Sequence, residues 1–230
     1  MTTLLLAVGL ALAGLAEDVE TAADAEQPTD TRQAAFGRLH AEEHTGALVK
    51  IAKDADTTPA KRWVAVRALG KNESVAARDA LIEFLASDNA PVRIAACLAL
   101  GERGDRALSG RVAARLEDKA LLVRHAAADA LGQLRDPGTI PDLARALEDP
   151  SNHYRGTSMW VRRHFVEAIG SIGGDGAIAP LKKALDDGDQ DVAQAAVKGF
   201  EKVAGFSYGE GRSDAEEQEA WRRWASQRGG

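Results

Sequence analysis

The chain has a single cysteine, Cys97, and few aromatic side chains, which make up 5% of its 230 residues. With one cysteine no internal disulfide can form, so packing alone must stabilise the fold. Because large rings are scarce while Ala and Leu recur throughout, we expect a core of many small contacts between closely packed helices.

Basic residues are neither in excess nor clustered. The formal net charge is -6, and the first basic residue of the chain is Arg32. Nucleic-acid binding depends on grouped Lys and Arg that release counterions from phosphates. The sequence therefore argues against nucleic acid as a partner.

The sequence has no hydrophobic run long enough to cross a bilayer. The opening stretch "MTTLLLAVGLALAGLAEDVE" is uncharged and apolar to the small-x-small triplet at 14–16, but a crossing needs about 20 apolar residues. We predict a signal peptide over 1–16 and export to the periplasm, cell envelope or extracellular space, with no stable membrane insertion after cleavage. The stretch lacks the usual Lys or Arg before its apolar run, which leaves an uncleaved anchor or a wrongly assigned start codon as alternatives.

Residues 17–31, "EDVETAADAEQPTDT", hold acids, Ala and Thr but no basic residue. Segments with so few large apolar groups do not fold alone. We predict an acidic flexible linker here.

The remaining sequence repeats itself. Similar segments end at one reference position in each unit, occupied by Gly37, Gly70, Gly101, Gly132, Gly170 and Glu201, at spacings of 33, 31, 31, 38 and 31 residues. Three further positions recur at fixed distances from it: an apolar residue (Leu48, Leu81, Val112, Leu143, Leu181), an acid (Asp54, Asp88, Asp118, Asp149, Asp187) and a base (Arg62, Arg93, Arg124, Arg162). This period indicates an array of repeats.

Each unit is predicted to be a helix, a short turn carrying Asp, and a second, Ala-rich helix. Neither helix can bury its apolar face alone, so neighbouring units must stack. We predict an all-α fold, an α-solenoid (α-α superhelix) of about five helical hairpins over 32–205 with a partial unit at its start. Residues 206–230 are predicted to form a C-terminal capping helix, begun by the S-x-x-E capping box of Ser213 and Glu216, with Trp221 and Trp224 covering the last repeat.

The pattern "L-x-x-x-L-x-D … V-R-x-x-A-A-x-A-L-G" resembles HEAT repeats, particularly the short bacterial kind similar to phycobilisome-lyase repeats. The resemblance implies that the turn Asp and the second-helix Arg bond across units, which makes Arg62, Arg93, Arg124 and Arg162 structural inter-repeat residues. It also implies that second helices line a concave face. Ala193 replaces the Arg in the last unit, so the pairing is in doubt there.

One short motif suggests zinc chemistry: His40, Glu43 and His44 form H-x-x-E-H, as in inverted zinc peptidases. The repeat period places it in a turn between helices, where the two His would not share a helix face. HEAT-type di-iron hydroxylases use His-Glu dipeptides, and none of the five His here precedes Glu. We therefore predict no metal and no cofactor, and keep the peptidase as a minor alternative.

Cys97 raises a second enzymatic alternative, because some proteins with these repeats attach bilin chromophores. Its position is filled in other units by Val66, Ala128, Val166 and Val197, which indicates a packing role. No nucleophile, base and orienting group can be combined into a triad, so we predict no catalytic residues. A bilin-lyase-like enzyme or enzyme-assembly subunit remains the alternative function.

The second helices also carry a variable row, seven and three residues before each reference position. This row contains Trp63, Arg67, Ile94, Leu98, His125, Asp129, Arg163, Glu167, Gln194 and Lys198. An ordinary solvated surface would account for it. Alternatively, exposed Trp63, Ile94 and Leu98 would form an apolar patch for a protein partner.

One unit is longer than the others by about seven residues, in the segment "PSNHYRGTSMW" that contains His153, Tyr154, Arg155 and Trp160. Insertions in repeat proteins often carry binding residues, although a surface insertion is also well tolerated. The sequence thus favours a non-enzymatic protein-protein interaction scaffold, with this loop and the variable row as candidate partner-binding surfaces.

Overall fold

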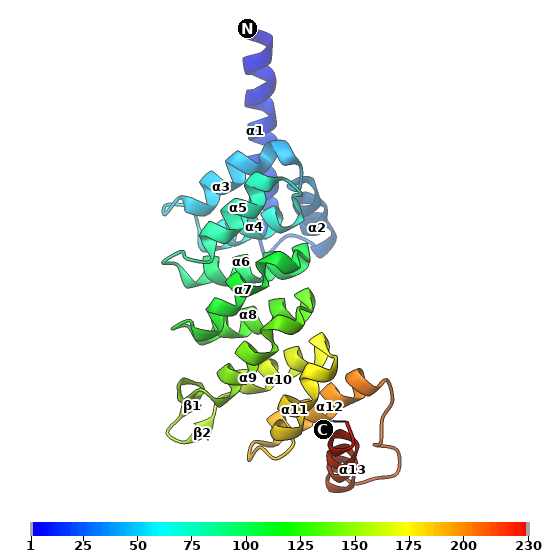
Figure 1. Cartoon of the computed structure of the whole chain (residues 1–230). Helices are drawn as coiled ribbons and strands as arrows, with labels where there is room; N and C mark the ends of the chain where they lie inside the picture. The colour runs from blue at the N-terminus through cyan, green and yellow to red at the C-terminus, as the bar shows by residue number, and fades with distance from the viewer. Residues whose placement is uncertain (1, 229–230) are drawn as a thin grey trace. The chain divides into compact units, whose positions relative to one another are not determined.

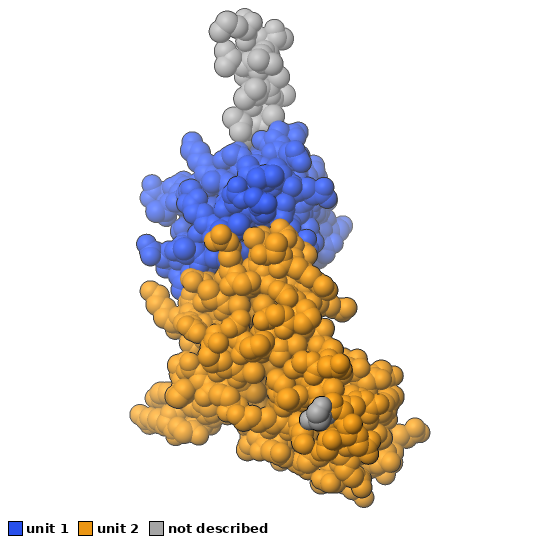
Figure 2. All heavy atoms as spheres, in the orientation of Figure 1, with its two compact units in different colours: residues 1–103 blue, residues 104–230 orange. Residues whose placement is uncertain are grey.

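The computed structural model describes residues 2–228 of the chain, and side chains from residue 13 onward. About 75% of the chain is helical, and it divides into two compact units, residues 1–103 and 104–230 (Figures 1 and 2). The fold class is the predicted α-solenoid of helical hairpins. Each unit is built from successive pairs of helices in which a first helix packs beside a second.

Unit 1 contains three pairs, formed by α1 (Thr2–Ala23) with α2 (Thr29–Arg38), α3 (Thr45–Lys53) with α4 (Pro59–Lys71), and α5 (Val75–Phe84) with α6 (Ala90–Arg103). The 3-10 turn η1 (Glu42–His44) precedes α3. Helix starts follow local chemistry: the Ser74 hydroxyl accepts a hydrogen bond from the Ala77 amide at 3.1 Å, and Pro59 occupies the first turn of α4.

Unit 2 also contains three pairs, and a final helix follows them. Its elements are η2 (Arg106–Leu108), α7 (Ser109–Ala113), η3 (Ala114–Glu117), α8 (Leu121–Leu134), η4 (Pro137–Thr139), α9 (Ile140–Glu148), η5 (Pro150–Asn152), β1 (His153–Tyr154), β2 (Thr157–Ser158), α10 (Val161–Ile172), α11 (Asp175–Ala184), α12 (Gln190–Ala204) and α13 (Asp214–Ser226). The two strands pair antiparallel, with His153 opposite Ser158.

The repeated apolar position of the sequence lies in the core of the five pairs that follow α1 and α2. Leu48, Leu81, Val112, Leu143 and Leu181 have no exposed surface. The glycine at the reference position permits successive second helices to approach closely. A Cβ added to Gly170 would lie 2.5 Å from the Cα of Gly199, and one added to Gly70 would lie 2.9 Å from the Cα of Ala99.

The N-terminal region differs from the prediction. Residues 17–23 belong to α1 and residues 29–31 to α2 (Figure 1), so the flexible-linker prediction for 17–31 was wrong. Leu15, Val19 and Ala22 are buried although the segment is rich in acids. Three small apolar groups on one helix face are enough when α2 and α4 lie against them.

The α1–α2 hairpin is a complete additional pair in a register that the sequence analysis missed. Arg32 Nε donates to the Ala22 carbonyl at 3.4 Å, as Arg62 Nε donates to the Ala52 carbonyl at 3.0 Å thirty residues later. In this register His40, and not Gly37, corresponds to Gly70. A Cβ added to Gly37 would meet no atom within 4 Å, so Gly37 does not belong to the series of close-packed glycines.

Helix α13 packs against α11 and α12 of the last pair. Trp221 is fully buried and stacks on Phe200 and Phe206, with both pairs of ring centroids 5.4 Å apart. The capping box is present, with the Ser213 amide donating to Glu216 at 2.9 Å. Because Trp221 and Trp224 are both buried, these rings do not form a binding surface.

Among the described residues, no helix combines the length and apolar character needed to span a membrane.

Candidate functional site

The variable row of the second helices forms a partly exposed stripe in each unit. In α4, α6, α8, α10 and α12 the two row positions are partly or fully exposed, while the residues between them are mostly buried. Binding partners can reach these side chains without unfolding a repeat.

Unit 1 does not contain the predicted apolar patch. Trp63, Ile94 and Leu98 are each half-buried, and the exposed large apolar residues of the described chain are Val75, Leu122, Tyr154, Trp160 and Phe206. Trp63 instead lines a pocket of about 440 Å³ together with Phe36 and His40 of the N-terminal pair. The prediction failed because that pair partly covers Trp63. Arg67 is held by an ion pair with Glu102.

Unit 2 carries the larger hollow, a groove of about 820 Å³ that runs over α8, α10 and α12. We call it the α8–α12 groove, and its lining is Ala128, Asp129, Gly132, Gln133, Arg135, Glu167, Ala168, Ser171, Ala195, Lys198, Gly199 and Lys202. Five of its lining residues are buried Ala and Gly, which would let a bound chain approach the helix backbones. Acidic side chains are contributed by α8 and α10, and lysines by α12.

A histidine cluster adjoins this groove. His125 and Asp129 lie one turn apart on α8, with His125 Nε2 and Asp129 Oδ2 separated by 3.3 Å. The His164 ring of α10 packs against His125 with centroids 4.1 Å apart. Trp160 lies edge-on to both rings, 5.1 Å from His125 and 5.4 Å from His164.

The protonation state of this cluster follows from its hydrogen bonds and burial. Burial, and then the neighbouring His125, lower the pKa of His164, so its ring is neutral at pH 7. His164 Nε2 accepts from Arg163 Nε at 3.4 Å, and Nδ1 lies 2.9 Å from the Glu167 carboxylate. This arrangement assigns the proton to Nδ1, which donates to Glu167. Burial raises the pKa of Asp129. The charge of Glu167 raises this pKa further, whereas His125 and His164 act to lower it.

Four members of this region, His125, Asp129, Glu167 and Trp160, were predicted from the sequence, whereas His164 was not. The position of His164 is occupied in other second helices by Val64, Ala95, Ala126 and Ala195, all of them buried. A histidine at a position otherwise reserved for small apolar residues was the signal. The groove residues Gln133, Arg135 and Lys202 were also missed, because they lie at helix ends outside the two row positions.

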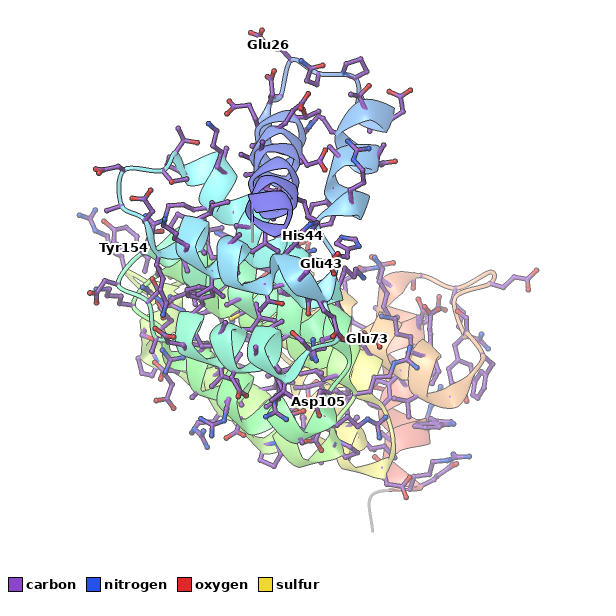
Figure 3. All side chains as sticks on the ribbon, turned by 90° about the horizontal axis from the view of Figure 1, so that it is seen from above. Glu26, Glu43, His44, Glu73, Asp105 and Tyr154 are labelled. Atoms are coloured by element: carbon purple, nitrogen blue, oxygen red, sulfur yellow. The ribbon has the colours of Figure 1, made fainter. Side chains whose placement is uncertain are left out.

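The inserted segment forms an ordered β-hairpin. Arg155 and Gly156 at its tip have φ values of 51° and 80°, as a two-residue hairpin turn requires. Tyr154 is exposed at the tip, where Figure 3 labels it, and Arg155 lies over its ring at 5.3 Å. His153 lines a separate hollow with Arg162 and turn residues 187–189. Of the predicted loop residues, only Trp160 contacts the histidine cluster.

The four predicted inter-repeat arginines hold the ends of the first helices. Each donates to a carbonyl at the end of the first helix of its own pair: Arg62 to Ala52, Arg93 to Ser87, Arg124 to Asp118 and Arg162 to Leu147. Arg162 also bonds across pairs, with its guanidinium 2.6 Å from the Asp187 carboxylate, and Arg124 reaches the Ser151 carbonyl at 3.4 Å. The Arg162–Asp187 bond is the one that the family resemblance implied.

The residues that suggested enzymatic chemistry lie in turns and in the core. His40 lies in the turn after α2, and Glu43 and His44 lie in the 3-10 turn η1 (Figure 3), so the motif does not lie on one continuous helix. Cys97 is fully buried in α6, as the Val and Ala at equivalent positions indicated. A buried thiol with apolar replacements is a packing residue.

Paired helices that repeat in this register define an α-solenoid protein. Residues 79–159 match the family model of HEAT repeats, and residues 61–87 and 161–187 match that of the PBS lyase HEAT-like repeat. The chain belongs to the HEAT-repeat family, with repeats of the phycobilisome-lyase type.

Solved structures show the same fold. The complex of CpcE and CpcF of phycocyanin lyase from Nostoc sp. PCC7120 is similar with a TM-score of 0.58 and 26% identity over 70% of this chain. This similarity spans 65% of that chain, less than two thirds of its length. Escherichia coli YibA is similar with a TM-score of 0.56 and 18% identity, over 82% of this chain and 72% of that one. An engineered protein is similar with a TM-score of 0.52 and 18% identity, over 82% of this chain and 88% of that one. No curated protein matches the chain in sequence.

Proposed function

We propose that the protein is a non-enzymatic interaction scaffold that binds a segment of a partner protein in the α8–α12 groove. The groove itself carries this proposal: it is open, five of its lining residues are buried Ala and Gly, and its walls bear opposite charges. Asp129 and Glu167 favour basic side chains of the partner, whereas Lys198 and Lys202 favour acidic ones. Exposed Trp160 adds an aromatic contact of the kind enriched at interfaces.

HEAT repeats support a protein partner in general, and the similar phycocyanin-lyase structure is itself a complex of two proteins, CpcE and CpcF. The same similarity favours a second candidate, a bilin-lyase-like protein or a subunit that assists such an enzyme. Cys97 would not carry that chemistry, since it has no exposed surface. Bilin handling that survives Cys97→Ala would support the second candidate.

Charge reversal in the groove should abolish partner capture. We expect the full chain with Lys198→Glu and Lys202→Glu to recover at least about tenfold less partner than the unaltered chain does, because both changes repel acidic side chains of the partner. A tenfold loss corresponds to about 1.4 kcal/mol of binding free energy. Recovery is measured by quantitative mass spectrometry of proteins captured from an extract. The matched control is Lys183→Glu on α11, which is exposed and does not line the groove. Equal recovery by the double variant and the control would refute the groove as the binding site.

We propose that the protein is exported and that its signal peptide is cleaved after Ala16. The support is the uncharged apolar run that ends in a small-x-small triplet. Cleavage there would remove the buried Leu15 and leave Val19 and Ala22 to hold the rest of α1. The intact mass of the protein isolated from cell-envelope and medium fractions should correspond to a chain that begins at Glu17. A mass that includes residues 1–16, or recovery from the cytoplasm alone, would contradict the proposal.

A further inference from the structure

The strongest unassigned feature of the described chain is the set of donor atoms on facing helices α8 and α10. His125, Asp129 and His164 each offer one donor atom, and these atoms all lie within 4.8 Å of one another. Among the described residues this is the one group of three or more His, Cys, Asp or Glu side chains with such spacing.

The distances agree with those around a bound divalent ion. Metal–nitrogen bonds of about 2.0–2.1 Å in a tetrahedral site place neighbouring donors about 3.3–3.5 Å apart. His125 Nε2 lies 3.3 Å from Asp129 Oδ2, and His164 Nδ1 lies 3.9 Å from Asp129 Oδ1. The three donor atoms lie within 4.8 Å of one another, so a shared ion requires them to move somewhat closer together.

The sequence places these donors on rigid elements. His125 and Asp129 are four residues apart on one helix, which puts them on the same face, and close packing of α8 against α10 brings His164 opposite them. A Cβ added to Gly132 would lie in van der Waals contact with α10, 3.4 Å from the Cα of Ala168, which shows how closely the two helices pack. The helix backbones therefore fix the relative position of the three ligands.

The surroundings suit a cation that keeps open coordination positions. Glu167 lies 2.9 Å from His164 Nδ1 and supplies a second negative charge beside Asp129. The side chains of His125 and Asp129 are 28% and 38% exposed, so an ion and its water ligands can enter. Two imidazoles with one carboxylate are typical ligands of Zn²⁺ and of other borderline divalent ions.

We propose that His125, Asp129 and His164 bind one divalent transition-metal ion of the Zn²⁺ class, which joins two successive repeats at the border of the α8–α12 groove. The ion replaces the proton on His164 Nδ1. This site is distinct from the H-x-x-E-H motif, whose residues lie in unit 1. The proposal does not depend on a protein partner, and its test uses none.

The test is a metal titration of the untagged full chain after chelator treatment and desalting. Zn²⁺ is titrated by calorimetry, and Co²⁺ by visible absorption and by tryptophan fluorescence. We expect one Zn²⁺ per chain, Co²⁺ absorption bands of a site with nitrogen ligands, and quenching by Co²⁺ that disappears in Trp160→Phe without loss of affinity. The quenching is expected because Trp160 contacts both histidine rings.

Variants then locate the site. His125→Ala, His164→Ala and the conservative Asp129→Asn should each weaken Zn²⁺ binding by at least about tenfold. His153→Ala in the hairpin of the same unit, and the double variant His40→Ala and His44→Ala, should bind as the unaltered chain does. Modification of His164 by diethyl pyrocarbonate, mapped by mass spectrometry with and without Zn²⁺, gives a second measurement on the unaltered protein, in which Zn²⁺ should protect the ring.

Two results would overturn the proposal: no saturable binding of Zn²⁺ or Co²⁺ by the unaltered chain up to millimolar metal, or unchanged binding by folded His164→Ala. Binding lost only in the His40 and His44 double variant would transfer the metal to the N-terminal motif and would equally refute the site described above.

Discussion

Replacement of Arg162 by Ala should lower the free energy of unfolding by about 3–5 kcal/mol, a large part of the total stability of a domain. Arg162 is buried on α10 and donates to the Leu147 carbonyl at 3.0 Å, to the Ser158 hydroxyl at 2.9 Å and to the Asp187 carboxylate at 2.6 Å. The variant leaves a largely buried carboxylate and a helix-end carbonyl without their donor. Urea denaturation of the full chain, followed by tryptophan fluorescence, measures the loss in unit 2, which contains three of the four Trp.

The adjacent residue supplies the control. The side chain of Arg163 is 44% exposed and lies 3.9 Å from Asp191, so Arg163→Ala should change stability by no more than about 0.5 kcal/mol. Arg162→Lys should not restore the lost stability, because a point charge cannot reproduce the forked guanidinium contacts. Similar losses in Arg162→Ala and Arg163→Ala would contradict the assigned role.

The Arg162–Asp187 ion pair also makes the stability of the protein depend on pH. Burial acts to raise the pKa of Asp187, but the hydrogen bonds from Arg162 and from the Asp189 amide outweigh it, so this pKa lies below its ordinary value. A lowered folded-state pKa stabilises the protein above the unfolded value of about 3.9, and that contribution is lost as pH falls through the folded value. The stability difference between the unaltered chain and Arg162→Ala should therefore shrink below about pH 4. A difference that stays constant down to pH 3 would contradict this linkage.

Gly170→Ala should destabilise unit 2 by about 1–3 kcal/mol, although alanine favours helices over glycine by about 1 kcal/mol. The added Cβ would lie 2.5 Å from the Cα of Gly199. A backbone atom cannot move aside as a flexible side chain can, so α10 and α12 must separate. The overpacking term therefore outweighs the helix propensity, and the unfolding midpoint in urea should fall.

The matched control for this prediction is Gly37→Ala on α2. A Cβ at Gly37 meets no atom within 4 Å, so we expect a gain of about 0.4–1 kcal/mol from helix propensity and reduced freedom of the unfolded chain. Opposite signs for the two substitutions would support both the close packing at Gly170 and the assignment of Gly37 outside the repeat series. Equal signs would contradict one of the two.

The fold could be predicted because the repeat imposes the same few requirements in each unit. A buried Leu in the first helix, an Arg that holds a helix end and a small residue between second helices are short-range signals at fixed spacing, and Leu81, Arg93 and Gly101 show all three. The α1–α2 pair could not be predicted from these signals. Its His40 stands where four of the other five units have glycine, and the nearby Gly37 gave a false alignment.

The candidate site was only partly predictable, for a related reason. Its residues come from two helices whose side chains meet only after packing, and the spacing of one helix indicates only its own face. His125 and Asp129 share a face and were found together, whereas His164 depended on the contact between α8 and α10. The basic side of the groove was predicted only in part: Lys198 belongs to the variable row, whereas Lys202 lies near the end of α12, outside the repeated pattern.

Site-specific photo-cross-linking tests the central claim, that the α8–α12 groove binds a protein segment, most directly. A benzophenone amino acid is placed in the full chain at Gln133 or Lys198, both exposed and lining the groove, or at the control positions Arg145 and Lys183 on the first helices. The groove account predicts one cross-linked protein common to positions 133 and 198 and absent from both controls, with cross-links that map to a single partner segment carrying basic and acidic residues. Cross-linking at positions 145 and 183 but not in the groove would contradict it.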